Sequence, residues 1–216
     1  WSPAKGRVRR IIAIAETWLR KLAIRRKTML DHFGILAPFY ERFIPPPSAE
    51  RWVKLLDLPV AGSLLDAGGG TGRVSGQLRP YVQHLVIADE SRKMLAEARA
   101  KALCCTVNGA VEMLPFAANS FDRVMVVDAL HHFASQREAI ADLARVLRPG
   151  GRLVIEEPDL HRLSVKFVAI GEKVALMRSK FYYPEQIAEM ATAVGLRVTV
   201  ESDGRFAAWV IAEKRD

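Results

Sequence analysis

The residues best suited to chemistry form a glycine-rich turn behind a short apolar run. The segment reads Leu64-Leu65-Asp66-Ala67-Gly68-Gly69-Gly70-Thr71-Gly72-Arg73, which is typical of a strand, a tight turn and a helix start. Glycine tolerates positive φ and has no side chain to block a ligand, so backbone N–H groups of this turn can approach a ligand closely. Asp89 follows nineteen residues after Gly70, at the end of a second apolar run. A carboxylate there can accept hydrogen bonds from both ribose hydroxyls, so the two features predict a nucleoside-containing cofactor.

The spacing of the glycines indicates which cofactor. A dinucleotide-binding turn requires G-x-G-x-x-G, which would place its third glycine at Arg73. The chain instead has Asp66-x-Gly68-x-Gly70-x-Gly72. Such a loop has no diphosphate to hold and suits a compact zwitterion, such as the methionine end of S-adenosylmethionine. At this point the chain resembles the class I S-adenosylmethionine-dependent methyltransferases.

Further segments carry this resemblance beyond the loop. Glu112–Phe116 followed by Asn119–Asp122 resembles the family's E-x-L-P-F … S-F-D sequence. Asp128–His132 resembles the end of its fourth strand, and Leu147–Gly151 resembles the turn before its fifth. The ubiquinone and menaquinone C-methyltransferases are similar over this core, but Asp128–His132 is not their usual sequence. The resemblance therefore implies the broader small-molecule methyltransferase group.

The elements that must position these residues alternate between strands and helices from Ser48 onward. Alternation of this kind predicts an α/β fold with a doubly wound, mostly parallel sheet. The resemblance implies seven strands in a Rossmann-like arrangement that ends in an antiparallel hairpin. Pro45-Pro46-Pro47 separates an N-terminal helical extension, 1–47, from the methyltransferase domain, 48–216. Two of the expected strands end at Asp66 and Asp89, and the others cover 104–107, 121–127, 152–155, 196–201 and 206–213. Three of the expected helices cover 48–56, 92–103 and Pro184 to Gly195, and another ends near 78. A further helix begins at a capping box formed by Ser135 and Glu138 and ends at 147.

The resemblance also assigns roles to individual residues. Asp66 and the backbone of the glycine turn would hold the methionine moiety and Asp89 the ribose, while a side chain at Gly68 would enter ligand space. Ala110 departs from the family, which usually has an aspartate there to receive the adenine amino group. Tyr40 would close over the cofactor or simply pack in its helix. The implied cofactor-binding set is Tyr40, Asp66, Gly68, Gly69, Gly70, Asp89, Glu90, Ala110, Val111, Glu112, Asp128 and Leu130.

Two histidines are the candidates for acid–base chemistry. His131 and His132 directly follow the fourth expected strand, at the reactive end of the cofactor site. A base is needed only if the methyl acceptor must lose a proton, so alignment of the acceptor alone is the alternative. Glu156, Glu157 and Asp159 are further polar residues nearby, and we expect them to be solvated or to bond to loop N–H groups.

The two cysteines, Cys104 and Cys105, predict neither a disulfide framework nor a metal site. Neighbouring residues of a strand point to opposite faces, so the two thiols cannot readily bind one metal ion. We expect both to be strand packing residues, because free cysteine is usually buried.

The charge of the chain lies in its N-terminal segment. The chain has a net charge of +8, and residues 1–27, with nine basic residues and one acid, hold all of it. Apolar residues within 11–22 recur at the spacing of one helix face. Two interpretations stay open: a basic amphipathic helix on an acidic membrane surface, or a helix packed on the catalytic domain. No run approaches the length of a membrane span and no secretory signal is visible, so we expect a cytoplasmic protein with peripheral contact to the inner membrane face under the first interpretation.

The methyl acceptor must be inferred from the variable segment at 160–183. This segment is rich in apolar residues, which favours a cover over a small lipophilic, quinone-like acceptor, although the same residues could form helix core. A nucleic-acid methyltransferase or binding module that uses the basic helix is the alternative. The fourth strand does not end in the Asn/Asp-Pro-Pro-Tyr/Phe sequence that amino-methylating nucleic-acid enzymes use, which makes this alternative weaker.

Overall fold

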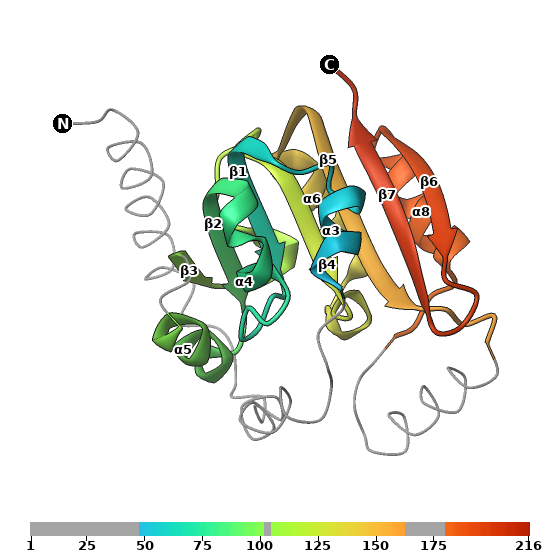
Figure 1. Cartoon of the computed structure of the whole chain (residues 1–216). Coiled ribbons are helices and arrows are strands. Elements are labelled where there is room, and N and C mark those ends of the chain that lie inside the picture. Colours follow the sequence, from blue (N-terminus) through green and yellow to red (C-terminus); the bar gives the residue numbers. More distant parts are fainter. Residues whose placement is uncertain (1–47, 102–104, 163–179) are drawn as a thin grey trace.

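The computed structural model of the chain describes residues 48–101, 105–162 and 180–216, and these form a seven-stranded α/β sheet with helices on both faces (Figure 1). The strand order is β3-β2-β1-β4-β5-β7-β6. Strand β7 runs antiparallel to both of its neighbours, whereas all other pairs are parallel. The predicted fold class is therefore confirmed. The strands are β1 (Val60–Ala67), β2 (Val82–Asp89), β3 (Cys105–Asn108), β4 (Phe121–Val127), β5 (Leu147–Pro158), β6 (Leu196–Ser202) and β7 (Ala207–Lys214).

Apolar side chains of the central strands alternate between two cores. Leu65, Val124 and Leu153 belong to the core under the helices α6 and α8, whereas their neighbours Leu64 and Met125 belong to the core under α3 and α4. Figure 1 shows these two pairs of helices on opposite faces of the sheet. Burial on both faces explains why the parallel strands read as continuous apolar runs. The helices are α3 (Ala49–Leu55), α4 (Ser75–Leu78), α5 (Arg92–Ala100), α6 (Gln136–Val146) and α8 (Pro184–Ala193), with short 3₁₀ turns at Arg79–Tyr81, Val111–Met113 and Leu130–His132.

Several predicted boundaries are confirmed and others need correction. Ser91 caps α5 as expected, since its hydroxyl accepts a hydrogen bond from the Met94 N–H, but the helix ends at Ala100. Strand β5 begins at Leu147, five residues earlier than expected, because the turn before it also pairs with β4. The expected packing role of Cys105 is wrong: it is exposed on β3, which lies at the edge of the sheet and has a neighbour on one side only. Cys104 lies outside the described residues.

The capping box expected at the start of α6 is only half formed. The Ser135 hydroxyl accepts a hydrogen bond from the Glu138 N–H at 3.5 Å. The Ser135 N–H, however, donates to the Glu112 carboxylate at 3.1 Å. A residue distant in sequence therefore takes the place that Glu138 would hold in a capping box.

Two of the motifs that carry the family resemblance are joined by an ion pair. Asp122 accepts two hydrogen bonds from the Arg148 guanidinium, at 2.7 and 2.8 Å, and one from the Ser63 N–H at 2.7 Å. A Cβ on Gly62 would lie 2.2 Å from an Asp122 oxygen. These contacts fasten the start of β4 to the starts of β1 and β5, so the motifs serve the frame of the sheet.

The Glu112–Phe116 motif is fixed in the same way by α6. The Asp142 carboxylate accepts a hydrogen bond from the Leu114 N–H at 2.6 Å. The Arg145 guanidinium donates to the carbonyl oxygens of Leu114 and Phe116. The segment that approaches the cofactor edge is thus held by two charged side chains of one helix.

The Asp122 contacts predict a pH-dependent loss of stability in Asp122→Asn. Burial alone raises the pKa of Asp122, but the Ser63 N–H and the Arg148 guanidinium outweigh it and hold the pKa below its usual value. A depressed carboxyl pKa stabilises the fold above the unfolded pKa, near 4, and this stabilisation is lost as the pH falls through the folded pKa. We expect Asp122→Asn to lower the free energy of unfolding by about 1–3 kcal/mol at pH 7 and by less near pH 3.

Urea unfolding at both pH values measures this difference. Asp57→Asn is the matched control, because the Asp57 side chain is 70% exposed and contacts Arg123 at 3.4 Å. Equal losses in the two variants at pH 7 would contradict a structural role for Asp122.

Candidate functional site

The carboxyl ends of the parallel strands meet where the strand order reverses between β1 and β4. The register pairs Ala67 with Ala88, Asp89 with Asn108 and Val127 with Glu156, so the segments that follow these strands lie along one edge. Ligands of doubly wound sheets bind at this edge. The residues that the sequence assigns to a cofactor lie on the segments at this edge, apart from Tyr40, which is outside the described residues.

The glycine turn after β1 has the backbone that its sequence predicts. Gly68, Gly70 and Gly72 all have positive φ, at 71°, 54° and 69°. The turn is tied to β2, since the Gly68 and Gly69 N–H groups both donate to the Ala88 carbonyl oxygen. Among the described residues, a Cβ on Gly70 would meet nothing closer than 3.9 Å, so no described segment covers this residue.

The expected reason for glycine at position 68 is wrong. A Cβ there would lie 2.9 Å from the Ala129 Cβ and 3.0 Å from the Phe133 ring, so it would collide with the segment after β4 and not with a ligand. Gly68 is needed because two chain segments approach each other closely at positive φ.

Asp66 lies beneath the turn and is almost fully buried. Its side chain packs so closely under Gly69 that a Cβ on Gly69 would lie 2.3 Å from the carboxyl carbon. Burial raises the pKa of Asp66 to about 7; the nearby Ser75 hydroxyl lowers it, and the negative charge of Asp89 raises it. The buried Oδ1 atom accepts no hydrogen bond from any residue that the structure describes. An unsatisfied carboxylate oxygen at this edge fits the ammonium group of a zwitterionic ligand, because such a cation would satisfy it.

Asp89 connects the glycine turn to the end of β2. One carboxylate oxygen accepts a hydrogen bond from the Gly70 N–H at 2.9 Å, and the other accepts one from the Ser91 N–H at 2.7 Å. Asn108, at the end of β3, donates from its side chain to the carbonyl oxygens of Asp89 and Glu90. Asp89 is thereby oriented in advance, whereas the Glu90 side chain is exposed.

The residues assigned to the adenine form a 3₁₀ turn beside this carboxylate. Gly109 donates its N–H to the Asp89 carbonyl oxygen, which brings the turn at Val111–Met113 next to the end of β2. Val111 is buried, and Ala110 is half-buried. The Glu112 carboxylate bonds to the Ser135 N–H, so this carboxylate already holds the start of α6.

Asp128 follows β4 with an unusual backbone. Its φ is +51°, a left-handed conformation that non-glycine residues adopt at some cost, and its N–H donates to the Glu156 carbonyl oxygen at 2.9 Å. Such strain concentrates at functional sites. Leu130, two residues on, is buried and starts the 3₁₀ turn that carries both histidines.

His131 lies in contact with the buried carboxylate of Glu157, a pairing that the sequence did not predict. Its Nδ1 atom lies 2.6 Å from an oxygen of Glu157, and the two side chains are only 2% and 5% exposed. The other Glu157 oxygen accepts a hydrogen bond from the Leu130 N–H at 2.8 Å. Of the two roles predicted for Glu157, bonding to a loop N–H is confirmed and solvation is wrong. The sequence pattern of β5 did not predict this pairing. The two side chains meet only because the loop that carries His131 folds back onto the end of β5.

The imidazole of His131 is also covered on its faces. The His132 ring centre is 3.9 Å away and the Phe181 ring centre 4.3 Å away, with Phe181 nearly parallel at 15°. Burial, together with the neighbouring charge of His131, lowers the pKa of His132 to about 3. His132 is therefore neutral at physiological pH.

Glu156, within β5, and Asp159, directly after it, are buried as well. An oxygen of Glu156 accepts a hydrogen bond from the Trp209 indole at 2.6 Å; burial raises the pKa of Glu156 to about 7, although this hydrogen bond lowers it. Asp159 accepts hydrogen bonds from the His161 N–H and the Ser202 hydroxyl. The prediction of loop N–H contacts is thus confirmed for Asp159, but Glu156 serves the packing under α3.

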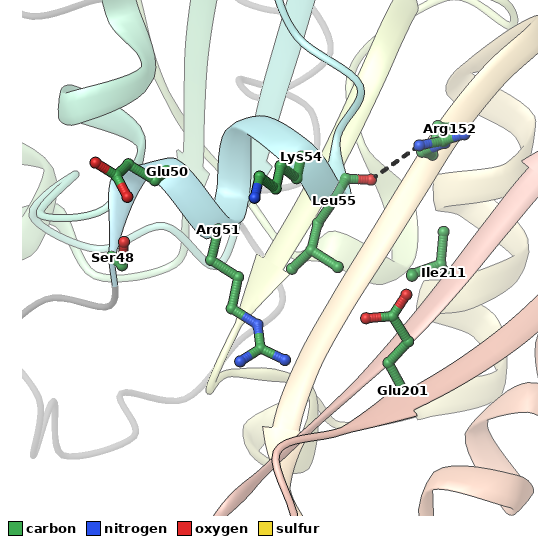
Figure 2. A pocket seen from close by; sticks show the side chains of 8 residues that line it. All are labelled: Ser48, Glu50, Arg51, Lys54, Leu55, Arg152, Glu201 and Ile211. Carbon is green, nitrogen blue, oxygen red and sulfur yellow. Dashed lines mark hydrogen bonds between the residues drawn. The ribbon is translucent and has the colours of Figure 1, made fainter.

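A hollow of about 630 Å³ lies away from this edge, between α3 and strands β5, β7 and β6 (Figure 2). Arg51 and Lys54 extend into it from α3, and Glu201 faces them from β6. None of the predicted site residues lines this hollow. Within the described ranges, no group of three or more His, Cys, Asp or Glu side chains is arranged to hold a metal ion.

Comparison with known proteins identifies the segment that forms this edge. Residues 65–155 match the family described as methyltransferase domain. The segment that forms this edge is therefore similar to methyltransferase domains. A methyltransferase of Archaeoglobus fulgidus described as S-adenosylmethionine-dependent has the same fold, with a TM-score of 0.67 at 16% identity over 85% of this chain and all of that chain. S-adenosylmethionine is the cofactor that this family implies, and the open turn and the unsatisfied Asp66 oxygen fit it.

Proteins of known sequence are similar to this domain over part of their length. An uncharacterized methyltransferase of Mycobacterium tuberculosis is 41% identical over 133 residues, which are 59% of this chain and 52% of that protein. A malonyl-[acyl-carrier protein] O-methyltransferase of Erwinia pyrifoliae is 37% identical over 53% of this chain and 45% of its own. The ubiquinone/menaquinone C-methyltransferase UbiE of Roseobacter denitrificans is 37% identical over 46% of this chain and 44% of its own. The chain therefore spans about half the length of these relatives or less.

The close contact of Asp66 with Gly69 predicts that substitutions at the two positions are coupled. We expect Gly69→Ala to destabilise the domain by about 1–3 kcal/mol, because its Cβ would overlap the buried carboxyl. Asp66→Ala should relieve the overlap, so the double variant should lose at least about 0.5 kcal/mol less than the sum of the single losses. Chemical denaturation of all three variants measures this coupling.

Gly70→Ala is the control for the coupling. It places a left-handed alanine on the same turn without reaching the Asp66 side chain. Asp66→Ala should not rescue it, and additive losses in both pairs would contradict the proposed contact.

Proposed function

We propose that the chain transfers a methyl group from S-adenosylmethionine to a small, lipophilic, quinone-like acceptor. The observation that carries the cofactor half of this proposal is the Asp89 carboxylate, oriented by two backbone N–H groups beside an open glycine turn. One similar protein is a quinone-pathway C-methyltransferase, which supports a lipophilic acceptor. A second similar protein is a malonyl-[acyl-carrier protein] O-methyltransferase, so the choice of carbon or oxygen depends on this chain's own residues.

Each part of the site would hold a different part of the cofactor. Asp66 and the backbone of Gly68, Gly69 and Gly70 would hold the methionine end, and Asp89, with Glu90 beside it, would hold the ribose. The adenine would lie against the turn that contains Ala110, Val111 and Glu112, and Asp128 and Leu130 would lie near the sulfonium. The bound cofactor supplies an electrophilic methyl group, so the chain's own task is to orient the acceptor and exclude water.

His131 and His132 are the proposed catalytic residues, and they stand at the end of β4 beside Asp128. Phe181, which stacks on His131, brings an aromatic side chain to the same place. Aromatic and imidazole rings at the reactive edge suit a planar, apolar acceptor. Tyr40 is proposed as a residue that closes over the cofactor, and it lies outside the described residues.

Replacement of Asp89 tests the cofactor half of the proposal. We expect Asp89→Ala to weaken binding of S-adenosylmethionine by about 1.5–3 kcal/mol, because hydrogen bonds to a charged group are lost and the glycine turn loses its anchor. Isothermal titration calorimetry on the full chain measures the change.

Asp203→Ala is a matched control for this experiment. Asp203 also accepts backbone N–H groups, from Arg205, Phe206 and Ala207, but in the hairpin between β6 and β7. The control should bind S-adenosylmethionine as the wild type does. Unchanged affinity in Asp89→Ala would refute the assigned ribose contact, and no binding by the wild type would refute the proposed function.

The basic segment 1–27 is proposed to place the enzyme at an acidic membrane surface, where a lipophilic acceptor is concentrated. Its net charge of +8 supports this, because each basic residue near an anionic surface contributes about 1 kcal/mol of attraction. No helix in the described part of the chain is long and apolar enough to cross a bilayer. The proposal therefore concerns peripheral contact alone.

Vesicle co-sedimentation tests the membrane proposal. The full chain should bind vesicles that contain phosphatidylserine, a version without residues 1–27 should not, and high salt should release the full chain because charge screening shortens to about 3 Å at 1 M. Neutral vesicles are the control. Binding to duplex DNA or RNA but not to acidic vesicles would instead favour the nucleic-acid alternative.

A further inference from the structure

We propose that Lys101 is a positioning residue for the methionine end of the cofactor. Its ammonium group holds the second half of the glycine turn in the shape in which this turn would receive the ligand. The inference rests on the proposed function, because it takes the glycine turn as the place where S-adenosylmethionine binds. It adds a residue that the sequence did not predict and assigns it to one end of the cofactor alone.

The contact that carries this proposal joins the end of α5 to the glycine turn. The Lys101 Nζ atom donates a hydrogen bond to the Thr71 carbonyl oxygen at 3.1 Å, across 30 residues of sequence. Lys101 is the exposed C-cap of α5, whereas Thr71, between Gly70 and Gly72, is only 4% exposed. A hydrogen bond from a charged donor is stronger than one between neutral groups. The position of the Thr71 peptide group therefore depends on a side chain from another element.

The two halves of the turn are held in different ways. The first half is tied to β2, because the Gly68 and Gly69 N–H groups donate to the Ala88 carbonyl oxygen. In the second half, the Gly72 N–H donates to the Gly69 carbonyl oxygen at 2.9 Å, which is a bond within the turn itself. Glycine at positive φ, as at position 72, gives the backbone much freedom unless a contact fixes it. Lys101 supplies such a contact from outside the turn.

Helix α5 is a firm support for this contact. Leu95 and Ala98 pack with Ile87 in a small buried cluster, so the helix is fixed to β2. The start of the same helix already shares the Asp89 carboxylate with the Gly70 N–H. The ammonium group lies at the other end of the helix, where the helix dipole favours a positive charge. The helix therefore meets the turn at both of its ends, at one through a carboxylate and at the other through an ammonium group.

The two ends of α5 would serve different parts of the cofactor. The Asp89 carboxylate is assigned to the ribose and also orients the Gly70 N–H, so its loss should affect both ends of the ligand. Thr71 directly follows the glycines that are assigned to the methionine end. Loss of the Lys101 bond should therefore raise the entropy cost of ordering the turn around the methionine moiety, while the nucleoside end keeps its contacts.

Calorimetry of the full chain with a pair of ligands tests this separation. S-adenosylhomocysteine carries both ends of the cofactor, whereas methylthioadenosine has the nucleoside and lacks the amino-acid group. We expect Lys101→Met to weaken binding of S-adenosylhomocysteine by at least about fivefold, the size of one net hydrogen bond, and binding of methylthioadenosine by less than about twofold. Lys101→Arg keeps a charged donor and should bind S-adenosylhomocysteine within about twofold of the wild type.

Arg99→Met is the matched control, because Arg99 is a second cation in the last turn of α5 and its Nε donates to the Leu95 carbonyl oxygen at 3.3 Å, within the helix. It removes the same charge from the same helix end and should bind both ligands as the wild type does. Unchanged affinity for S-adenosylhomocysteine in Lys101→Met, equal weakening of both ligands in that variant, or the same loss in Arg99→Met would overturn the inference.

Amide hydrogen exchange of the ligand-free full chain separates this inference from the proposed function. In Lys101→Met the Gly72 N–H should exchange at least about tenfold faster, because the second half of the turn opens more often, whereas the Gly70 N–H, held by Asp89, should keep its rate. Failure of the wild type to bind S-adenosylhomocysteine would sink the proposed function and leave the exchange result to stand on its own. An unchanged rate at Gly72, or faster exchange at both glycines, would contradict the role assigned to Lys101.

Discussion

The site depends on one constraint: the glycine turn and the start of α5 must share the carboxylate of Asp89, which lies nineteen residues after Gly70. Each oxygen takes one backbone N–H, from Gly70 in the glycine turn and from Ser91 at the start of α5. This fixes the turn relative to the end of β2, because the turn also donates two N–H groups to Ala88. The same carboxylate oxygens retain lone pairs for ribose hydroxyls. The group that would recognise the nucleoside is thus also the group that shapes the loop for the methionine end.

The motifs outside the glycine turn that carry the family resemblance have a different physical basis. Asp122 and Arg148 join the starts of β1, β4 and β5, and the Asp142 and Arg145 side chains hold the backbone at Leu114. None of these four charged residues touches the cofactor edge. Their effect is to hold the segments that do, which explains why a family resemblance in sequence extends far beyond the residues that perform chemistry.

The sequence was sufficient for the fold, and it predicts a site at the carboxyl ends of the central strands. Strands buried on both faces read as apolar runs, and the positive φ of three glycines was visible as their spacing. What the sequence could not show were contacts between segments distant along the chain. The contact between Glu157 and His131 spans 26 residues, and Glu112 takes the place of Glu138 at the start of α6. Glycine is needed at position 68 because the Phe133 ring leaves no room for a Cβ there. Cys105 was misread for a related reason, since edge and interior strands of such a sheet look alike in sequence.

The two adjacent glutamates of β5 show how one residue of register gives neighbouring carboxylates different partners. Successive strand residues point to opposite faces. Ile155 packs in the core under α6 and α8 and Val154 in the core under α3, so Glu157 lies on the first face and Glu156 on the second. Glu156 accordingly meets the Trp209 indole, and Glu157 meets Leu130 and His131 where the segment after β4 passes over the strand end.

Burial acts on both glutamates, but their partners differ in what a proton does to them. Trp209 offers only a neutral hydrogen-bond donor, so protonation of Glu156 removes the buried negative charge and changes nothing on Trp209. His131 can itself take up a proton and become a cation, and the buried carboxylate beside it makes that change favourable. Glu157 therefore differs from Glu156 in having a partner that can itself accept a proton.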